Sequence, residues 1–450
     1  MIEIKHDHKL QFPPIKVPRY NEDNEEGPDI YKQTDIEGVL VPLIRFNDIT
    51  ITFEMVDKMT LTCDPMPYID IKITDFMELI RILDQPGHDN ILYLQILPPF
   101  DDAYKKIQLA FYMDNISIVG QSVSMSGRYY VPKLYDTVMK PYGIITSYKL
   151  FEQVSNDYSL GFCSNVEDTQ DERYIYNPNK SIEWFLEDEI GFTGEKEHVY
   201  TWWIDFWNNI NFVDLFKEYT ELTPEDKMLI WVTDNFKDTD DAPEPRQQIA
   251  AFTNHPAFAA SPTFIHSYKP VLNASPVTDK NFEIYSMDDQ EASSTLIQDG
   301  DVHNDIFTQY EYGGEKFGEF DYLSQKACRN MFLNKINSQC IEVVSTHPLI
   351  ALMKGDHVNL WWYDMGSELA NAADNTDVHT NAPVPEVKET MAESEDVQMV
   401  LNKTVSGQYY IIDIEYKYIG HRNWEVKYTL SRSAEEIQKL SPPTKETFIK

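Results

Sequence analysis

Apolar and polar side chains alternate through Ser406-Gly-Gln-Tyr-Tyr-Ile-Ile-Asp-Ile-Glu-Tyr-Lys-Tyr418 and again through Trp424-Glu-Val-Lys-Tyr-Thr-Leu-Ser-Arg432. Such alternation is typical of a β-strand that buries one face. The apolar set of the first stretch is Tyr410, Ile412, Ile414, Tyr416 and Tyr418. Residues 420–423 begin with a glycine and can turn the chain back between the two strands. The sequence therefore predicts a long antiparallel hairpin, which we interpret as part of a β-barrel.

The same alternation occurs near the start of the chain. Ile69, Ile71 and Ile73 alternate with Asp70 and Lys72. Further strands are expected at residues 49–53, 91–97, 107–113 and 116–125, with a helix near 75–84. Together these segments predict an antiparallel β-barrel over residues 37–132. Residues 1–36 are rich in proline and acidic side chains, and we interpret them as an extended N-terminal arm.

The middle of the chain has helical spacing. Tyr148, Phe151 and Val154 are three residues apart, and Ser181 precedes a second apolar run as a helix cap. Residues 200–207 read as a strand. A further helix is predicted from the apolar stripe Phe212, Leu215, Phe216 and Tyr219. Residues 133–227 are therefore expected to form an α+β insert domain.

The remainder returns to β-structure. Residues 228–335 are a mixed region, with a strand at 228–235 and a helix at 322–335. Residues 336–434 are expected to form the second β-barrel, with strands at 340–344 and 358–363 before the hairpin. A disordered-like insertion at 366–400 interrupts this barrel, and 435–450 is a C-terminal tail. The predicted fold class is mostly β, with two antiparallel β-barrels around a mixed α+β middle region.

Composition limits the possible functions. The chain has 450 residues, 38 Lys and Arg against 74 Asp and Glu, and a formal net charge of −36. Because phosphate contacts need basic groups, we do not expect nucleic acid to wrap around its surface. The four cysteines are widely spaced, which predicts neither a disulfide framework nor a cysteine zinc site. No apolar run is long enough for a signal peptide or a membrane-spanning segment, so we expect neither.

Motifs for catalysis, cofactors or metals are missing from the sequence. It has no glycine-rich phosphate loop, no HExxH and no GxSxG. His6 and His8 fall in the expected arm and are interpreted as solvated, and His347 and His357 as packing residues. We therefore predict no catalytic, cofactor-binding or metal-binding residue, and a protein that is not an enzyme.

One segment keeps a second interpretation open. Asp205 lies among Trp202, Trp203 and Trp207, and tryptophan rings beside a carboxylate suit a protein that binds or hydrolyses glycans. Against this, alternation would place apolar side chains on both faces of a strand at 202–207. A buried aspartate in such a strand is more often a hydrogen-bonded structural carboxylate.

Three segments resemble a known family when taken in order. The hairpin at 406–432 is similar to a closing "SGxYxI" strand that returns to end in Leu-x-Arg. Leu352-Met-Lys-Gly-Asp-His-Val358 resembles a "GDxV" turn after a helix and barrel strand at 327–343. Trp203-Ile-Asp-Phe-Trp-Asn-Asn-Ile-Asn-Phe-Val-Asp214 resembles an "ID" strand that runs into "LNFV" and a helix. In this order the segments resemble the central baseplate hub proteins of contractile-tailed bacteriophages, a family related to the hub part of type VI secretion spike proteins.

The resemblance implies a structural virion protein. It implies a homotrimer in which each chain holds two tail-tube-like barrels, so that three chains present six barrels to a six-fold tube. The implied partners are the tail tube protein, the spike protein and other baseplate proteins, with DNA only passing through an axial channel. The implied location is the tail baseplate of the virion, assembled in the host cytoplasm. The acidic arm and the 366–400 insertion depart from the family pattern.

Overall fold

The computed structural model describes most of the two β-rich blocks and the region between them. The residues described are 2–13, 15, 41–47, 49–51, 55–75, 90–97, 107–193, 198–220, 228–231, 249–255, 271–273, 308–310, 333, 339–345, 352–365, 399–401, 405–420 and 423–432. Most of the expected helices at 75–84 and 322–335, nearly all of the 366–400 insertion and the 435–450 tail lie outside them.

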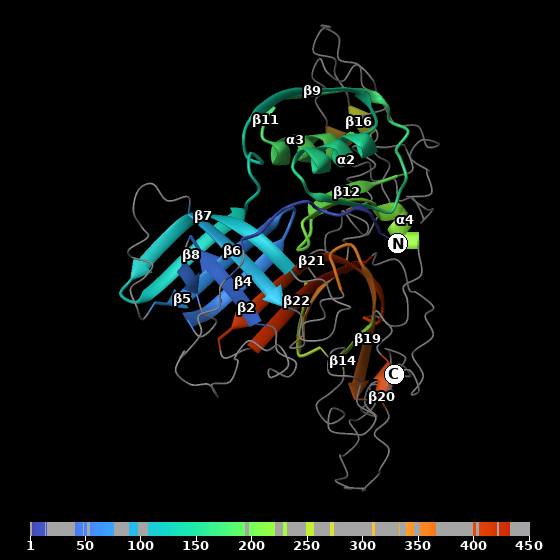
Figure 1. Ribbon diagram of the computed structural model, residues 1–450. Helices are drawn as coiled ribbons and strands as arrows, with labels where there is room; N and C mark the ends of the chain where they lie inside the picture. The colour runs from blue at the N-terminus through green and yellow to red at the C-terminus, as the bar shows by residue number, and fades with distance from the viewer. Residues whose placement is uncertain are drawn as a thin grey trace, which may run out of the picture.

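The fold is mostly β, as the sequence predicts, and one large curled sheet dominates it (Figure 1). Its main path runs in the order β15-β18-β22-β21-β4-β5-β8-β7-β6-β2-β3. The strands of this path are β2 (Val41–Phe46), β3 (Ile49–Ile51), β4 (Val56–Cys63), β5 (Pro67–Thr74), β6 (Ile91–Leu97), β7 (Ile107–Val119), β8 (Ser122–Tyr129), β15 (Ala251–His255), β18 (Gln339–Ser345), β21 (Gly407–Ile419) and β22 (Asn423–Arg432).

Strands from the two ends of the chain meet within this sheet. Tyr416 of β21 lies opposite Leu61 of β4, and Tyr418 opposite Met59. All four side chains are buried, because one face of each strand carries the apolar set. The two β-rich blocks are therefore joined side by side as one sheet. Off the main path, β14 (Met228–Trp231) and β20 (Met399–Leu401) pair with β19 (His357–Met365), which pairs with β21.

Several predicted strands are confirmed and others need correction. The closing hairpin forms as β21 and β22, and the alternation of β5 is confirmed. The expected strands at 107–113 and 116–125 are wrong as a pair, because β7 continues to Val119 and turns at 120–121 into β8. The strict alternation of β21 is also wrong, because a bulge at Ile412 places Ile411 rather than Ile412 in the core.

The α+β region forms smaller sheets above the large one (Figure 1). Helix α2 (Ser147–Asp157) and helix α3 (Ile182–Ile190) confirm the helical spacing and the cap position of Ser181. The strands here are β1 (Glu3–His6), β10 (Gly161–Ser164), β12 (Tyr200–Ile204) and β13 (Asn209–Asp214) in one sheet, and β9 (Val138–Ile145) with β11 (Arg173–Lys180) in another. Two short strands, β16 (Val271–Asn273) and β17 (Thr308–Tyr310), pair with each other in parallel.

Two local expectations for this region are wrong. The predicted helical stripe that starts at Phe212 fails, because Phe212 lies in β13 and helix α4 begins only afterwards (Leu215–Thr220). The interpretation of His6 as a solvated residue of the arm is wrong, because it lies in β1, which pairs antiparallel with β10. The hydroxyl of Ser155 lies 3.1 Å from Nε2 of His6, which ties the strand to helix α2.

Candidate functional site: the junction around Asp205

Asp205 lies in a tight turn between β12 and β13, not within a strand. Its Oδ1 accepts hydrogen bonds from the backbone N–H groups of Trp207 (2.8 Å) and Asn209 (2.9 Å). Its Oδ2 accepts from the side-chain amides of Asn209 (3.0 Å) and Asn211 (3.1 Å). Asp205 is 4% exposed. Because β12 ends at Ile204, the expected alternation through residue 207 is wrong.

The environment of Asp205 is that of a structural carboxylate. Burial raises the pKa of Asp205 above its ordinary value of 3.8, and the donors on Asn209, Asn211 and Trp207 act in the opposite direction. These donors belong to the same turn and to the strand that follows it. The turn is therefore held by its own aspartate, in the way that Asx turns are.

The aromatic side chains of this segment face inward. Trp202, Trp203 and Phe206 are 3%, 1% and 4% exposed. The indole N–H of Trp202 donates to Glu187 (3.2 Å), and its ring lies against Phe151 of helix α2. Stacking on a sugar requires an open ring face, and these three rings have none. Trp202 and Trp203 therefore offer a sugar no ring face, whereas Trp207 of the same segment is half-buried.

The same segment contacts the large sheet at several points. The Cys63 thiol donates to the carbonyl of Ile204 (2.7 Å), and the Ile204 N–H donates to the carbonyl of Pro65 (2.7 Å). The Tyr129 hydroxyl donates to Oδ1 of Asn208 (2.7 Å). These contacts join three segments that are far apart in sequence, at residues 63–65, 129 and 204–208. The turn therefore fastens the α+β region to the sheet.

A third segment, the turn at 352–356, packs against Trp203 and strand β21 at this contact. Gly355 has φ +92°, and a Cβ at this position would lie 2.5 Å from the Trp203 ring. The backbone N–H of Gly355 donates to the carbonyl of Ile411 (2.9 Å), and Phe206 packs edge-on against Tyr416 at a centroid distance of 5.3 Å. We name this contact between residues 202–211, the turn at 352–356 and strand β21 the junction.

The ends of the closing hairpin are also tied together. Arg432 Nη1 donates to the carbonyl of Ser406 (2.9 Å), and its guanidinium lies 4.7 Å from the ring centre of Tyr409. The Ser406 hydroxyl accepts from the Trp362 N–H (2.9 Å). The first and last residues of the hairpin motif thus hold one another and the neighbouring strand β19.

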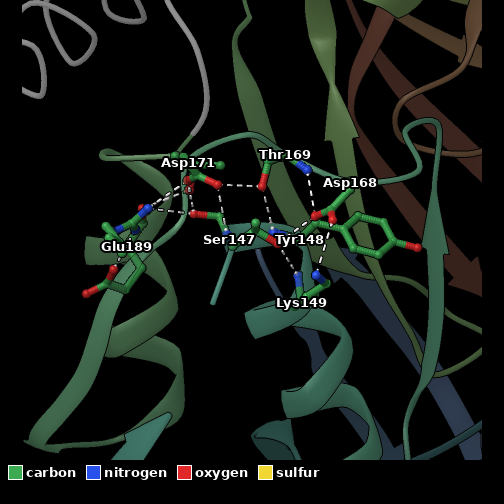
Figure 2. A network of polar contacts seen from close by, with 10 residues as sticks. Ser147, Tyr148, Lys149, Asp168, Thr169, Asp171 and Glu189 are labelled. Carbon is green, nitrogen blue, oxygen red and sulfur yellow. Dashed lines mark hydrogen bonds and ion pairs between the residues drawn. The ribbon is translucent and has the colours of Figure 1, made fainter. Parts of the chain in front are cut away.

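A second polar network lies at the start of helix α2 (Figure 2). The first N–H groups of a helix have no partner within it. Here the N–H of Ser147 donates to Asp171 (3.0 Å), that of Tyr148 to the Thr169 hydroxyl (3.1 Å) and that of Lys149 to the Thr146 hydroxyl (3.3 Å). Side chains thus satisfy three N–H donors that have no partner within the helix, which fixes the loop that leads to β11.

Arg173 links this network to helix α3. Its guanidinium donates to Asp171 (2.7 Å) and to Glu189 (2.8 Å). Burial alone would raise the pKa of Asp171, but hydrogen bonds from Ser147 and Thr169 and the charge of Arg173 outweigh it and lower the pKa. The carboxylate therefore stays charged and holds two helices and the first residue of β11 together.

This lowered pKa gives a prediction for Asp171→Asn. We expect the variant to lose about 2 kcal/mol of stability at neutral pH, because buried donors lose a charged acceptor. A lowered pKa contributes stability above the unfolded value of 3.8 and loses it as the pH falls through the folded value. The difference between the wild type and the variant should therefore shrink in acid, as measured by chemical unfolding at several pH values. Glu172→Gln at an exposed neighbouring position is the control, and an equal loss there would contradict the assignment.

The other candidate side chains of the sequence are not brought together. His357 is buried and lies edge-on against Tyr410, which agrees with packing, and His347 lies outside the described residues. Within the part of the chain that the structure describes, no three His, Cys, Asp or Glu side chains are placed to hold a metal ion. Among those residues no helix is long and apolar enough to cross a membrane. Cys63, Cys163 and Cys340 are buried free thiols.

The sequence did not reveal the asparagines of the junction or the network of Asp171. The signal for the first was present, since aspartate followed by Asn208 and Asn209 is typical of a turn rather than a strand. The second depends on contacts between Ser147 and Asp171, which are 24 positions apart. No local pattern reports such a contact.

The chain is similar in structure to two classes of protein over most of its length. No protein-family model matches the sequence, and no curated protein sequence matches it. The tail protein from Neisseria meningitidis MC58 matches with a TM-score of 0.48 at 7% identity, over 88% of this chain and 97% of that chain. The 43 kDa tail protein of prophage MuSo2 from Shewanella oneidensis matches with a TM-score of 0.48 at 9% identity, over 88% and 99%.

An Escherichia coli component of the type VI secretion system, described as similar in structure to two tail proteins of bacteriophage T4, matches with a TM-score of 0.38 at 10% identity. That match covers 98% of this chain and 79% of the other. The solved structures to which the chain is similar are thus two phage tail proteins and a type VI secretion component.

Proposed function

We propose that this chain is a non-catalytic structural protein of a phage tail: a trimeric baseplate hub that joins the tail tube to the central spike. In this role the ring forms part of the genome-ejection channel. Its partners are two further copies of itself, the tube protein, the spike protein and other baseplate proteins. It is assembled in the host cytoplasm and resides in the virion baseplate.

The observation that carries the proposal is the junction. The three segments whose order resembles the hub family are separate in the chain, at 203–214, 352–358 and 406–432, yet they contact one another. Trp203 packs against Gly355, and Phe206 packs against Tyr416. Because the three motifs contact one another, the same fold depends on all of them. This supports the view that they do not occur together in one sequence by chance.

The proposed two tube-like barrels would be formed by the strands of the large sheet. Its outermost described strands are β3 and β15, each with one described neighbour. Unpaired strand edges favour pairing with another chain, and a closed ring of copies satisfies them. We infer that each end of the sheet closes into a barrel, so that three chains present six barrels.

The polar face of the sheet suits a channel wall that DNA passes without binding. Lys427 lies 3.1 Å from Glu415 and 3.4 Å from Glu342, and Lys417 lies 2.9 Å from Glu425. These cross-strand pairs occupy the face opposite the core. Because lysines held by carboxylates release few counterions from phosphate, they offer DNA little affinity.

The test is the mass of the purified protein in solution, measured by size exclusion with light scattering. The proposal expects three times the chain mass of 52.5 kDa. A monomer at every concentration that binds polysaccharide would instead support a glycan-binding protein. Substituting Trp207, the half-buried tryptophan of the 202–207 segment, would then abolish that binding, which separates the two functions.

A further inference from the structure

The sheet of β9 and β11 has one covered face and one open face. On the covered face Ile175 and Asn177 are buried, and Tyr142 stacks on Phe185 of helix α3 at a centroid distance of 5.6 Å. Opposite residues of an antiparallel pair point to the same side. The register therefore identifies the side chains of the other face.

Three apolar rows make up this open face. Tyr174 lies opposite Ile144, Tyr176 opposite Pro141, and Pro178 opposite Met139. We name this set the apolar ladder: Met139, Pro141, Ile144, Tyr174, Tyr176 and Pro178. Ile144 and Met139 are each 68% exposed and Tyr174 is 66% exposed. No described element of the chain pairs with either outer edge of this two-stranded sheet.

The size of the ladder is that of an interaction site. Six such side chains leave on the order of 300 Å² or more of contiguous apolar surface, and patches of this size on soluble proteins are often functional. A single exposed apolar residue needs no explanation, but three adjoining rows do. Tyrosine is also enriched at the centres of interfaces.

The ladder is held rigidly, which favours binding. At one end of the ladder Ile145 of β9 pairs with Arg173 of β11. This pair lies beside the network in which Arg173 and Ser147 contact Asp171. The stacking of Tyr142 on Phe185 supports it from below. A preorganised surface loses little conformational entropy when a partner docks.

The charges around the ladder indicate the partner. Lys140 is paired with Asp157, and Lys180 with Asp188. These two bases are thus neutralised, while the exposed Asp136 and Glu172 lie just before β9 and β11, at opposite ends of the ladder. A second copy would bring the same acidic rim, and like charges oppose such a contact. A partner with a basic rim would be attracted.

We propose that the apolar ladder is the docking surface for a different protein, whose contact surface has an apolar centre and a rim of Lys and Arg. The protein that binds the ladder is therefore not one of the copies of this chain that form the proposed ring. The proposal rests on the ladder itself and stands whether or not the chain forms trimers.

The test uses two synthetic β-hairpin peptides with the same apolar face of Ile, Leu, Phe and Trp, one flanked by Lys and Arg and the other by Glu. Binding to the full-length protein is followed by fluorescence anisotropy. We expect the basic peptide to bind at least about tenfold more tightly than the acidic one, which corresponds to about 1.4 kcal/mol. The double variant Ile144→Ser/Tyr174→Ser should weaken the basic peptide by about tenfold or more.

Val119→Ser is the matched control, because Val119 is 75% exposed at the tip of the β7–β8 hairpin, away from the ladder. This variant should bind as the wild type does, and unchanged melting temperatures show that all variants are folded. Equal binding of both peptides, or of the double variant, overturns the proposal. An association of the protein with itself that the double variant abolishes in sedimentation velocity overturns it too. The mass of the double variant tests the trimer separately.

Discussion

Gly355→Ala is expected to lower the free energy of unfolding by about 4 kcal/mol, the largest effect of any single substitution considered for the junction. Two costs add together. The φ of +92° is a left-handed conformation that alanine adopts only with strain. The new Cβ would also lie 2.5 Å from Cη2 of Trp203, and this ring is fully buried and has no room to retreat. Chemical unfolding measures the change.

Gly143 provides a matched control for this substitution. Its φ is +87°, but a Cβ there would meet nothing within 4 Å. Gly143→Ala therefore carries the conformational cost alone, about 1 kcal/mol. Combining Gly355→Ala with Trp203→Leu should recover part of the loss, since the smaller side chain relieves the contact. Equal effects of the two glycine substitutions would contradict the packing of Trp203 on Gly355.

Asp205→Ala is expected to cost about 3 kcal/mol, because buried N–H donors of Trp207 and Asn209 lose their acceptor. The pH dependence should be opposite to that of Asp171. Burial raises the pKa of Asp205, so the folded chain holds the proton more tightly than the unfolded chain does. The contribution of Asp205 to stability is therefore greatest at low pH and falls as the pH rises from 3.8 through the folded value.

Unfolding of the wild type and of Asp205→Ala at several pH values checks this result. Asp136→Ala, at an exposed position, is the control and should change stability little. A variant as stable as the wild type would show that the turn does not depend on Asp205. If Asp205 were instead a catalytic residue of a glycan-hydrolysing protein, Asp205→Ala would lower hydrolysis and leave stability unchanged.

Alternation was sufficient to predict most strands of the large sheet. Strand β5 and the closing hairpin were predictable because one face is buried against the core and the other is polar. Helix α2 was predictable for the corresponding reason, since Leu150, Phe151 and Val154 face one side. The local sequence pattern therefore predicts an element wherever that element buries one face and exposes the other.

The errors fall where burial is complete or where tertiary contacts set the register. All six residues of β13 are buried, so its sequence has no period that could separate a strand from a helix. The bulge at Ile412 is fixed by pairing with β22. The pairing of β21 with β4 brings together residues more than 350 positions apart, and the sequence of neither strand predicts which strand it pairs with.

The junction was half visible in the sequence. The aromatic side chains indicated packing, and the structural interpretation of Asp205 agrees with its four donors. The partners of Trp203 and Phe206 could not be inferred, since they depend on how the turn at 352–356 and strand β21 are placed. The apolar ladder was missed because its two strands contain prolines and a bulge, which disturb the alternation.

The central claim, a ring of three copies built from this sheet, is tested most directly by electron cryo-microscopy of the purified protein together with its tube protein. The account predicts a three-fold particle with six β-barrels around an axial channel, and with the Lys427 and Glu415 face of the sheet toward the axis. A single copy bound to the tube, or a ring with that face turned outward and the channel lined by other elements, would contradict it.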